Sequence, residues 1–106
     1  MTGPEVAAML ERVERLPEEW RCSDITCAHW PTFRSCGGWV IPLDIALRLH
    51  LSHIAEKLAG MRWTVAYRFS VDRWNVFDRQ DEEQASSPTY ASALIAAAEA
   101  CGGRGE

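Results

Sequence analysis

The sequence predicts a protein of the α+β class, in which three helices pack on a small antiparallel sheet. Apolar residues recur at helical spacing in three stretches, residues 4–16, 42–59 and 88–101. Between the last two, residues 62–70 and 73–80 alternate apolar and polar side chains, as half-buried strands do. The predicted order is helix, loop, helix, strand, strand, helix, and 106 residues suit a single domain, residues 1–106.

The first helix has signals at both ends. Thr2 can cap it, with Glu5 three residues later completing a capping box and Pro4 in the first turn. Pro17 cannot continue a helix, so the helix should end near Leu16.

Residues 17–41 show no clean period and are predicted to form a long loop that carries cysteine and tryptophan. A two-stranded sheet is only marginally stable, so a third short strand within residues 20–41, or an edge-strand homodimer, is expected to complete the sheet.

The second helix should run from Pro42 to Ala59, with Gly60 as its stop. We interpret His50 and His53, which share a face of this helix, as boundary residues at the seam between helix and sheet. The apolar stripe of the helix consists of Leu43, Leu47, Leu51, Ile54 and Leu58, widened by Ala46 and Ala55.

In the hairpin, Phe69 is placed opposite Trp74, because a slip of one residue would mix apolar and polar faces. The apolar face should pack against the second helix and against Leu94 and Ala97 of the third. That face carries Trp63, Val65, Tyr67, Phe69, Trp74 and Val76.

The third helix follows a polar connector, residues 81–87. Ser87 should cap it, Pro88 should take its first position, and Gly102 should end it. Residues 102–106 are expected to form a frayed tail.

Several stretches resemble a known family. "PLDIALRL", "GMRWTVAYRF", "RWNVF" and "SSPTYASALIAAAEA" are similar to small bacteriophage proteins of the phage ABA sandwich domain family, over residues 42–101. The resemblance implies an α/β sandwich and a phage or prophage origin, but no established reaction. The cysteine-containing loop departs from the family pattern.

The segment of residues 21–39 raises the question of a metal site. Cys22, Cys27, His29 and Cys36 give the spacing C-x4-C-x-H-x6-C, and zinc favours such ligands. A disulfide and free thiols are the alternatives. Zinc usually comes with paired cysteines, and a second close pair is lacking, so we expect free thiols and no metal or other cofactor.

The motifs of enzymes are scarce in this sequence. It contains no Gly-rich phosphate loop, no Ser elbow and no paired carboxylates. A cysteine nucleophile with a histidine base is the one enzymatic arrangement the composition permits, and no cysteine stands out. We therefore expect a protein that is not an enzyme.

The polar face of the hairpin offers the strongest candidate binding residues: Arg68, Arg73, Phe77 and Arg79. Arginine with an aromatic side chain on a flat sheet suits an acidic protein surface, a nucleotide or single-stranded nucleic acid. The alternative is a solvated face whose arginines pair with carboxylates from the helices.

Together with the phage origin that the resemblance implies, these observations predict a binding protein that acts on a host protein or protein complex to inhibit a defence system. A binder that sequesters a nucleotide-type ligand and a zinc-stabilised module that contacts nucleic acid are the alternatives. The net charge of −4 argues against nucleic acid as the main partner. The N-terminus lacks a signal peptide and no stretch is long enough to span a membrane, which predicts the host cytoplasm without a membrane partner.

Overall fold

The computed structural model describes residues 3–103 and confirms the α+β class. Thr2 and residues 104–106, for which a cap and a frayed tail are predicted, lie outside the described residues. The elements are α1 (Gly3–Glu14), a short 3-10 helix η1 (Glu18–Trp20), β1 (Ile25–His29), β2 (Thr32–Ser35), β3 (Val40–Ile41), α2 (Leu43–Gly60), β4 (Thr64–Arg68), β5 (Arg73–Phe77), β6 (Glu83–Ser87) and α3 (Tyr90–Gly103).

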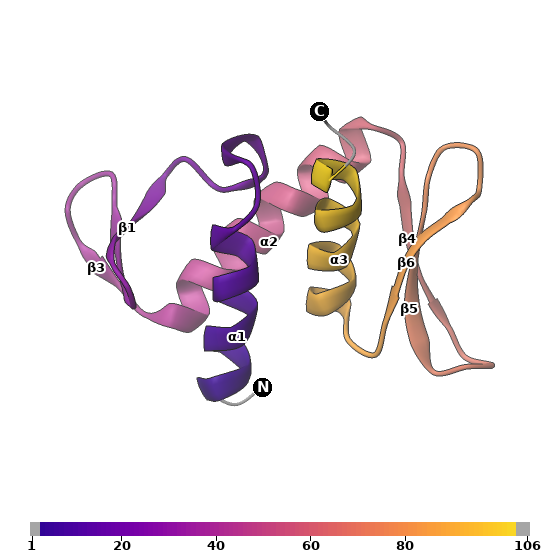
Figure 1. Ribbon diagram of the computed structural model, residues 1–106, viewed down its shortest axis with the longest axis horizontal. Coiled ribbons are helices and arrows are strands. Elements are labelled where there is room, and N and C mark those ends of the chain that lie inside the picture. Colours follow the sequence, from indigo (N-terminus) through magenta and orange to yellow (C-terminus); the bar gives the residue numbers. More distant parts are fainter. Residues whose placement is uncertain (1–2, 104–106) are drawn as a thin grey trace.

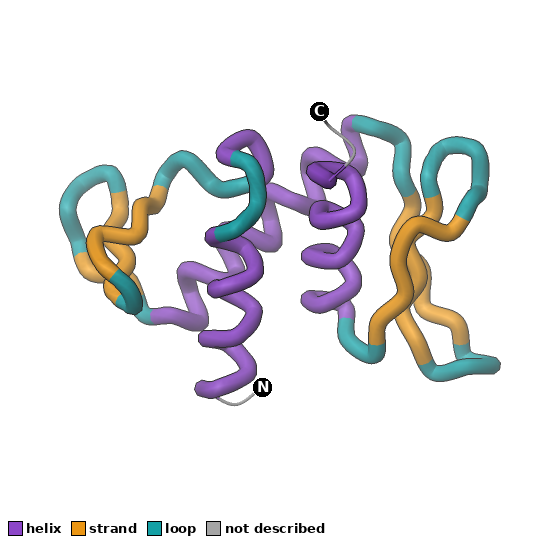
Figure 2. Tube along the Cα trace, viewed as in Figure 1, coloured by secondary structure: helices purple, strands orange, loops and turns teal. Residues whose placement is uncertain are grey.

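The elements form successive layers along an elongated molecule of 41 × 31 × 19 Å. Figure 1 shows the antiparallel sheet β1-β2-β3 at one end, α1 and α2 next to it, then α3, and the antiparallel sheet β4-β5-β6 at the other end. Figure 2 shows the same arrangement, with the strands at the two ends and the helices between them. The three helices therefore separate two sheets that share no strand.

The prediction of a long loop over residues 17–41 is wrong. This segment contains η1 and all three strands of the first sheet, with Phe33 paired to Cys27 on one side and to Ile41 on the other. The strands are short and β1 is irregular between Cys27 and His29, which hides the period of two. A strand in this segment was expected, but it builds a separate sheet and does not extend the β4–β5 hairpin.

The helix α2 agrees closely with its prediction. It begins after Pro42 and ends at Gly60, and Ala46, Leu47, Ile54 and Leu58 are buried, whereas Leu51 is half-buried. His50 does not lie at the edge of the apolar stripe as expected. It is fully buried, with its ring edge-on to Phe33 of β2 at a centroid distance of 6.1 Å.

The register of the β4–β5 hairpin differs from the prediction by two residues. Tyr67, and not Phe69, stands opposite Trp74. A shift of two keeps the same residues on each face, so Val65, Tyr67, Trp74 and Val76 still share the inner face. Phe69, however, moves into the turn and is 88% exposed, which corrects its predicted place in the core.

The predicted connector before the third helix is in fact β6, which pairs with β5 and supplies the third strand of this sheet. Its polar side chains fit the polar face of β5. Arg73 Nε donates to Ser86 Oγ at 2.8 Å, and Asn75 Nδ2 donates to Glu83 Oε1 at 2.7 Å. The polar residues of β6 are therefore explained by hydrogen bonds to polar side chains on the same face of β5, and they do not indicate a loop.

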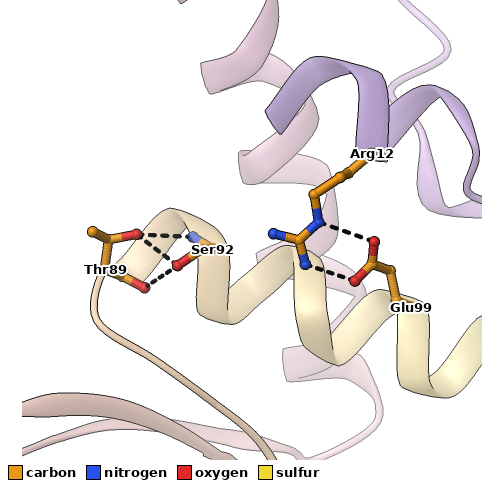
Figure 3. A network of polar contacts seen from close by, with 4 residues as sticks. All are labelled: Arg12, Thr89, Ser92 and Glu99. Atoms are coloured by element: carbon orange, nitrogen blue, oxygen red, sulfur yellow. Dashed lines mark hydrogen bonds and ion pairs between the residues drawn. The ribbon is translucent and has the colours of Figure 1, made fainter. Parts of the chain in front are cut away.

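The helix α3 lies at the centre of the molecule, between the α1–α2 pair and the second sheet (Figure 1). Ala93, Ala97 and Ala98 are fully buried, and their small side chains let neighbours approach from both sides. The cap is Thr89 and not Ser87, because Thr89 Oγ1 accepts the Ser92 N–H at 3.2 Å (Figure 3). The remaining buried apolar residues of the core are Val6, Leu10, Val13, Leu16, Trp20, Ile25, Phe33, Ala46, Leu47, Ile54, Leu58, Val76, Leu94 and Ile95.

The first and last helices, α1 and α3, are in contact. Arg12 donates from Nε and Nη2 to the two carboxylate oxygens of Glu99, at 3.0 and 2.6 Å (Figure 3). Gly102 does not stop α3, which continues to Gly103. Its role is steric, because a Cβ at Gly102 would come within 3.0 Å of the Pro17 ring.

No helix in residues 3–103 is long and apolar enough to cross a membrane.

Candidate functional site

The sheet β4-β5-β6 is covered by α3 on one face only. In Figure 1 the helix lies on the side toward the molecular centre, and no described helix lies on the far side. The far face, called here the outer face, carries the polar side of the hairpin, as the alternation of side chains requires.

Two of the four predicted binding residues meet at one end of the outer face. Arg68 and Arg73 are cross-strand partners at the last pair before the β4–β5 turn. Like charges directly opposite each other disfavour a sheet. Arg73 is held by its bonds to Ser86 Oγ and to the Ser86 carbonyl at 3.1 Å, whereas Arg68 is exposed.

The other two predicted residues lie at the opposite end. Phe77 pairs with Thr64 at the start of β4, which places it roughly 13 Å from Arg68 at about 3.3 Å per residue. Arg79 is exposed in the β5–β6 turn, which Asp78 organises by accepting the N–H groups of Gln80 and Glu82. The four residues therefore do not converge on one point.

The expected carboxylate partners of these arginines are absent from the described part of the chain. The ion pairs there join Arg12 to Glu99, and Arg21 and His50 to Glu14. The helices thus do not neutralise the arginines of the outer face, which also carries the Glu83 carboxylate bonded to Asn75. Between the ends of the outer face lies Asn75, which is only 3% exposed and whose Oδ1 has no hydrogen-bond partner within residues 3–103.

The sequence pattern did not predict the most exposed apolar group of this region. Phe69 is 88% exposed and Val71 is 54% exposed, and both lie in the β4–β5 turn between Arg68 and Arg73. We call residues 68–73 the hairpin tip. The sequence contains no signal for this exposure, because a register shifted by two residues keeps the same alternation and places Phe69 in the strand.

A row of aromatic rings supports the hairpin tip from the inner side. Phe69 lies edge-on to Tyr67 at 5.0 Å, Tyr67 lies 5.3 Å from Trp74, and Trp74 lies 5.1 Å from Tyr90 of α3. The Tyr67 hydroxyl donates to the Asp72 carboxylate, and this bond raises the pKa of Tyr67. The tip is therefore fixed to the helix layer by packed rings.

A second exposed apolar group lies on the first sheet. Trp39 is 78% exposed and Val40 follows it at the start of β3, also exposed. Trp30 is more covered, because its ring lies edge-on to Phe33 at 6.0 Å. The strands of this sheet carry a single arginine, Arg34, whose Nη1 donates to the Gly38 carbonyl at 3.0 Å, whereas the hairpin tip carries two.

The four candidate zinc ligands, Cys22, Cys27, His29 and Cys36, are not gathered into a metal site within the described residues. All four cysteines are free thiols, and no group of three or more metal-ligating side chains within residues 3–103 is placed to hold a metal ion. Cys22 and Cys27 instead line a pocket of about 300 Å³ together with His50. Cys36 is exposed in the turn after β2.

The chemistry of this pocket does not favour a Cys–His nucleophile. Burial, with a smaller effect from Glu14, raises the pKa of the Cys27 thiol, so the thiol stays protonated. His50 Nδ1 accepts the Cys22 N–H at 3.0 Å, so the neutral ring carries its proton on Nε2. A ring whose free lone pair is already engaged cannot accept the proton of a thiol.

Comparisons with protein-family models, curated proteins and solved structures find no match for this chain. The resemblance of residues 42–101 to the phage ABA sandwich domain family therefore stays a prediction from the residues.

Proposed function

We propose that this protein acts by binding another protein, with the hairpin tip as the centre of the interface. The observation that carries the proposal is the exposure of Phe69 between Arg68 and Arg73, two cationic side chains without a carboxylate partner among the described residues. Aromatic residues and arginine are the types that dominate the energetic centres of protein interfaces.

The shape of the surface favours a protein over a small ligand. The tip protrudes from the end of the sheet, and the outer face continues from it toward Phe77 and Arg79 without bringing the arginines together. A small anionic ligand needs converging donors, whereas a protein can contact groups spread over a face of this size. The nucleotide-type ligand predicted for the arginine face is therefore the weaker candidate there.

The charge of the surface indicates the chemistry of the partner. Arg68 and Arg73 favour a partner whose interface is acidic around an apolar depression that receives Phe69. Because residues 42–101 resemble small bacteriophage proteins, we take this partner to be a protein of the bacterial host and the consequence of binding to be inhibition of a defence system. This assignment of the partner rests on the resemblance alone.

The test replaces Phe69 by Ser and compares the variant with Trp39→Ser, a matched change of an equally prominent aromatic residue on the other sheet. The parent protein and both variants are used as baits in host lysate, and the affinity of each for the purified partner is then measured by calorimetry. Phe69→Ser should weaken binding by about 2 kcal/mol or more, the scale of an interface centre. Trp39→Ser should bind as the parent does.

Stability provides the control for Phe69→Ser. Since the ring is mostly in solvent, its loss should change the free energy of unfolding by less than about 1 kcal/mol. If Phe69→Ser binds the partner like the parent while Trp39→Ser does not, the interface lies on the first sheet and the proposal is wrong.

A further inference from the structure

A pocket of about 300 Å³ lies at the other end of the molecule from the hairpin tip, beside β1. Residues from α1, η1, β1 and α2 and from the segment between η1 and β1 form its walls: Glu14, Glu18, Arg21, Cys22, Ser23, Ile25, Thr26, Cys27 and His50. Its distance from the hairpin tip makes it a separate site, independent of the proposed protein interface.

Two residues that line this pocket each have a buried nitrogen without an acceptor among the described residues. The nitrogens are Arg21 Nε and His50 Nε2, and the His50 side chain is only 2% exposed. The backbone N–H of Cys22 occupies His50 Nδ1, so Nε2 of the neutral ring is a donor. Buried polar groups in folded proteins nearly always have a partner, so two unpartnered donors in one pocket indicate an oxygen that they are shaped to hold.

Glu14 supplies the complementary acceptor. Its Oε2 lies 3.9 Å from His50 Nε2 and its Oε1 lies 3.7 Å from Arg21 Nη1. Both separations exceed a hydrogen bond, so the three side chains face one another without satisfying one another. A bound molecule that offers an acceptor to the two nitrogens and a donor to the carboxylate would complete all three.

We propose that this pocket binds a small neutral molecule through an amide edge, in which a carbonyl oxygen lies beside an N–H group. The carbonyl oxygen accepts from His50 Nε2 and Arg21 Nε, and the N–H donates to Glu14. Anionic ligands fit poorly, because Glu14 and Glu18 both line the pocket. A simple cation such as an ammonium group also fits poorly, because it offers no acceptor to Arg21 and His50.

The electrostatics of the pocket keep His50 in the form that this recognition needs. Burial first, then the charge of Arg21 and then His53 lower the pKa of His50 to about 4. The ring is therefore neutral near pH 7 and donates from Nε2 without adding positive charge to the pocket.

Two sources present this edge on a ring of suitable size. One is a nucleobase lactam, as in uracil, and the other is a carboxamide, as in nicotinamide. The apolar wall at Ile25 and the thiols of Cys22 and Cys27 suit the flat face of either ring.

The test uses nuclear magnetic resonance of the protein labelled with 15N in its histidine rings. The free protein should show His50 protonated on Nε2. Uridine and nicotinamide are then titrated to millimolar concentrations. N3-methyluridine and N,N-diethylnicotinamide serve as matched probes that keep the ring and lose the N–H. At least one unblocked probe should shift the His50 Nε2 signal saturably, and its blocked counterpart should bind at least tenfold more weakly.

The outcome also identifies the source. A response to uridine alone indicates a nucleobase, and a response to nicotinamide alone indicates a carboxamide. If no probe shifts His50, or if the blocked probes bind as well as the unblocked ones, the proposal is overturned and the two donors are held by water.

A pair of variants tests the role of the carboxylate. Glu14→Ala should weaken binding of the responding probe at least tenfold, while Glu11→Ala, an exposed glutamate on the same helix, should leave it unchanged. If Glu14→Ala fails to fold, Arg21→Gln with Arg15→Gln as its control makes the same comparison on the donor side. Unchanged affinity in the folded Glu14→Ala or Arg21→Gln variant contradicts the proposal.

Discussion

His50 illustrates how much the surroundings of one residue decide. It sits on α2, with Phe33 of β2 against its ring, Glu14 of α1 and Arg21 after η1 near Nε2, and His53 one turn along its own helix. Burial lowers its pKa to about 4 even though the Glu14 carboxylate is 3.9 Å away. Desolvation of the ring therefore outweighs attraction to the carboxylate.

The first prediction concerns the dependence of stability on pH. In the unfolded chain His50 titrates near pH 6.5, and in the folded protein near pH 4, so protonation favours the unfolded chain. The loss of stability caused by His50 is absent above the unfolded pKa and grows as the pH falls from about 6.5 to 4. The shift corresponds to a loss of about 3 kcal/mol over that window. Denaturant unfolding of the parent and of His50→Asn, which keeps an acceptor for the Cys22 N–H, measures it.

The comparison of slopes isolates His50 from the carboxylates, which titrate in both proteins. His50→Asn should lose about 3 kcal/mol less than the parent between about pH 7.5 and pH 4. His29→Asn, at an exposed position on β1, should keep the slope of the parent. Equal slopes for parent and His50→Asn would show that the ring is solvated and titrates normally.

The sequence could not reveal these roles of single residues. The spacing of His50 and His53 places both on one face of α2, and His50 is buried because β2, α1 and the segment after η1 all approach it. Asn75 is likewise more buried than its pattern predicts. A polar residue in an alternating strand is expected to be exposed, yet neighbours on three strands leave it 3% exposed. The binding role assigned to Arg68, Arg73, Phe77 and Arg79 stays a prediction.

At the scale of elements, local signals identified all three helices and the β4–β5 hairpin but not the other strands. A pattern with a period of two cannot distinguish registers that differ by two residues, which explains the error at Phe69. Strands β1, β2, β3 and β6 lack the alternation of apolar and polar residues that β4 and β5 have: β1 is irregular between Cys27 and His29, β2 has one apolar residue, β3 has two residues and β6 is polar. Each exists because a neighbouring strand pairs with it. Such pairing is a tertiary effect that composition does not encode.

The second prediction concerns the first turn of α3. Thr89 Oγ1 accepts the Ser92 N–H and also contacts Ser92 Oγ at 2.7 Å, so it satisfies a donor that the helix leaves open. Thr89→Ala should lower the free energy of unfolding by about 1 kcal/mol, whereas Ser87→Ala, at the position that the sequence favoured as the cap, removes no cap bond. Denaturant unfolding of both variants distinguishes them, and a larger loss in Ser87→Ala would restore the cap to Ser87.

At the scale of the whole molecule, Arg12 and Glu99 are 87 residues apart in the sequence, and their contact joins α1 to α3. The bond to Glu99 raises the pKa of Arg12, and the pair is bidentate but partly exposed. A third prediction follows from a double-mutant cycle with Arg12→Ala and Glu99→Ala. Their coupling energy should be about 0.5–1 kcal/mol and should fall in high salt. A coupling near zero at low salt would mean that the two side chains remain solvated and apart.

The central place of α3 leads to the last prediction, which concerns cooperativity. The helix is packed against α1 and α2 on one side and against β5 and β6 on the other, so it joins the α1–α2 pair to the second sheet. Leu94 is fully buried in α3, so Leu94→Ala should lower the free energy of unfolding by about 2–5 kcal/mol. The indole N–H signals of Trp20, beside α2, and Trp74, on β5, report separately on the two ends of the molecule in denaturant titrations followed by nuclear magnetic resonance.

In Leu94→Ala the unfolding transitions reported by the two indole signals should move to lower denaturant concentration by the same amount. They should keep a common midpoint, because both layers unfold together. Trp39→Ser, at an exposed position outside the core, serves as the control and should leave both midpoints in place. If Leu94→Ala moves the Trp74 transition but leaves that of Trp20 unchanged, the α1–α2 layer with its sheet folds without α3. The molecule would then consist of two folding units rather than one cooperative structure organised around that helix.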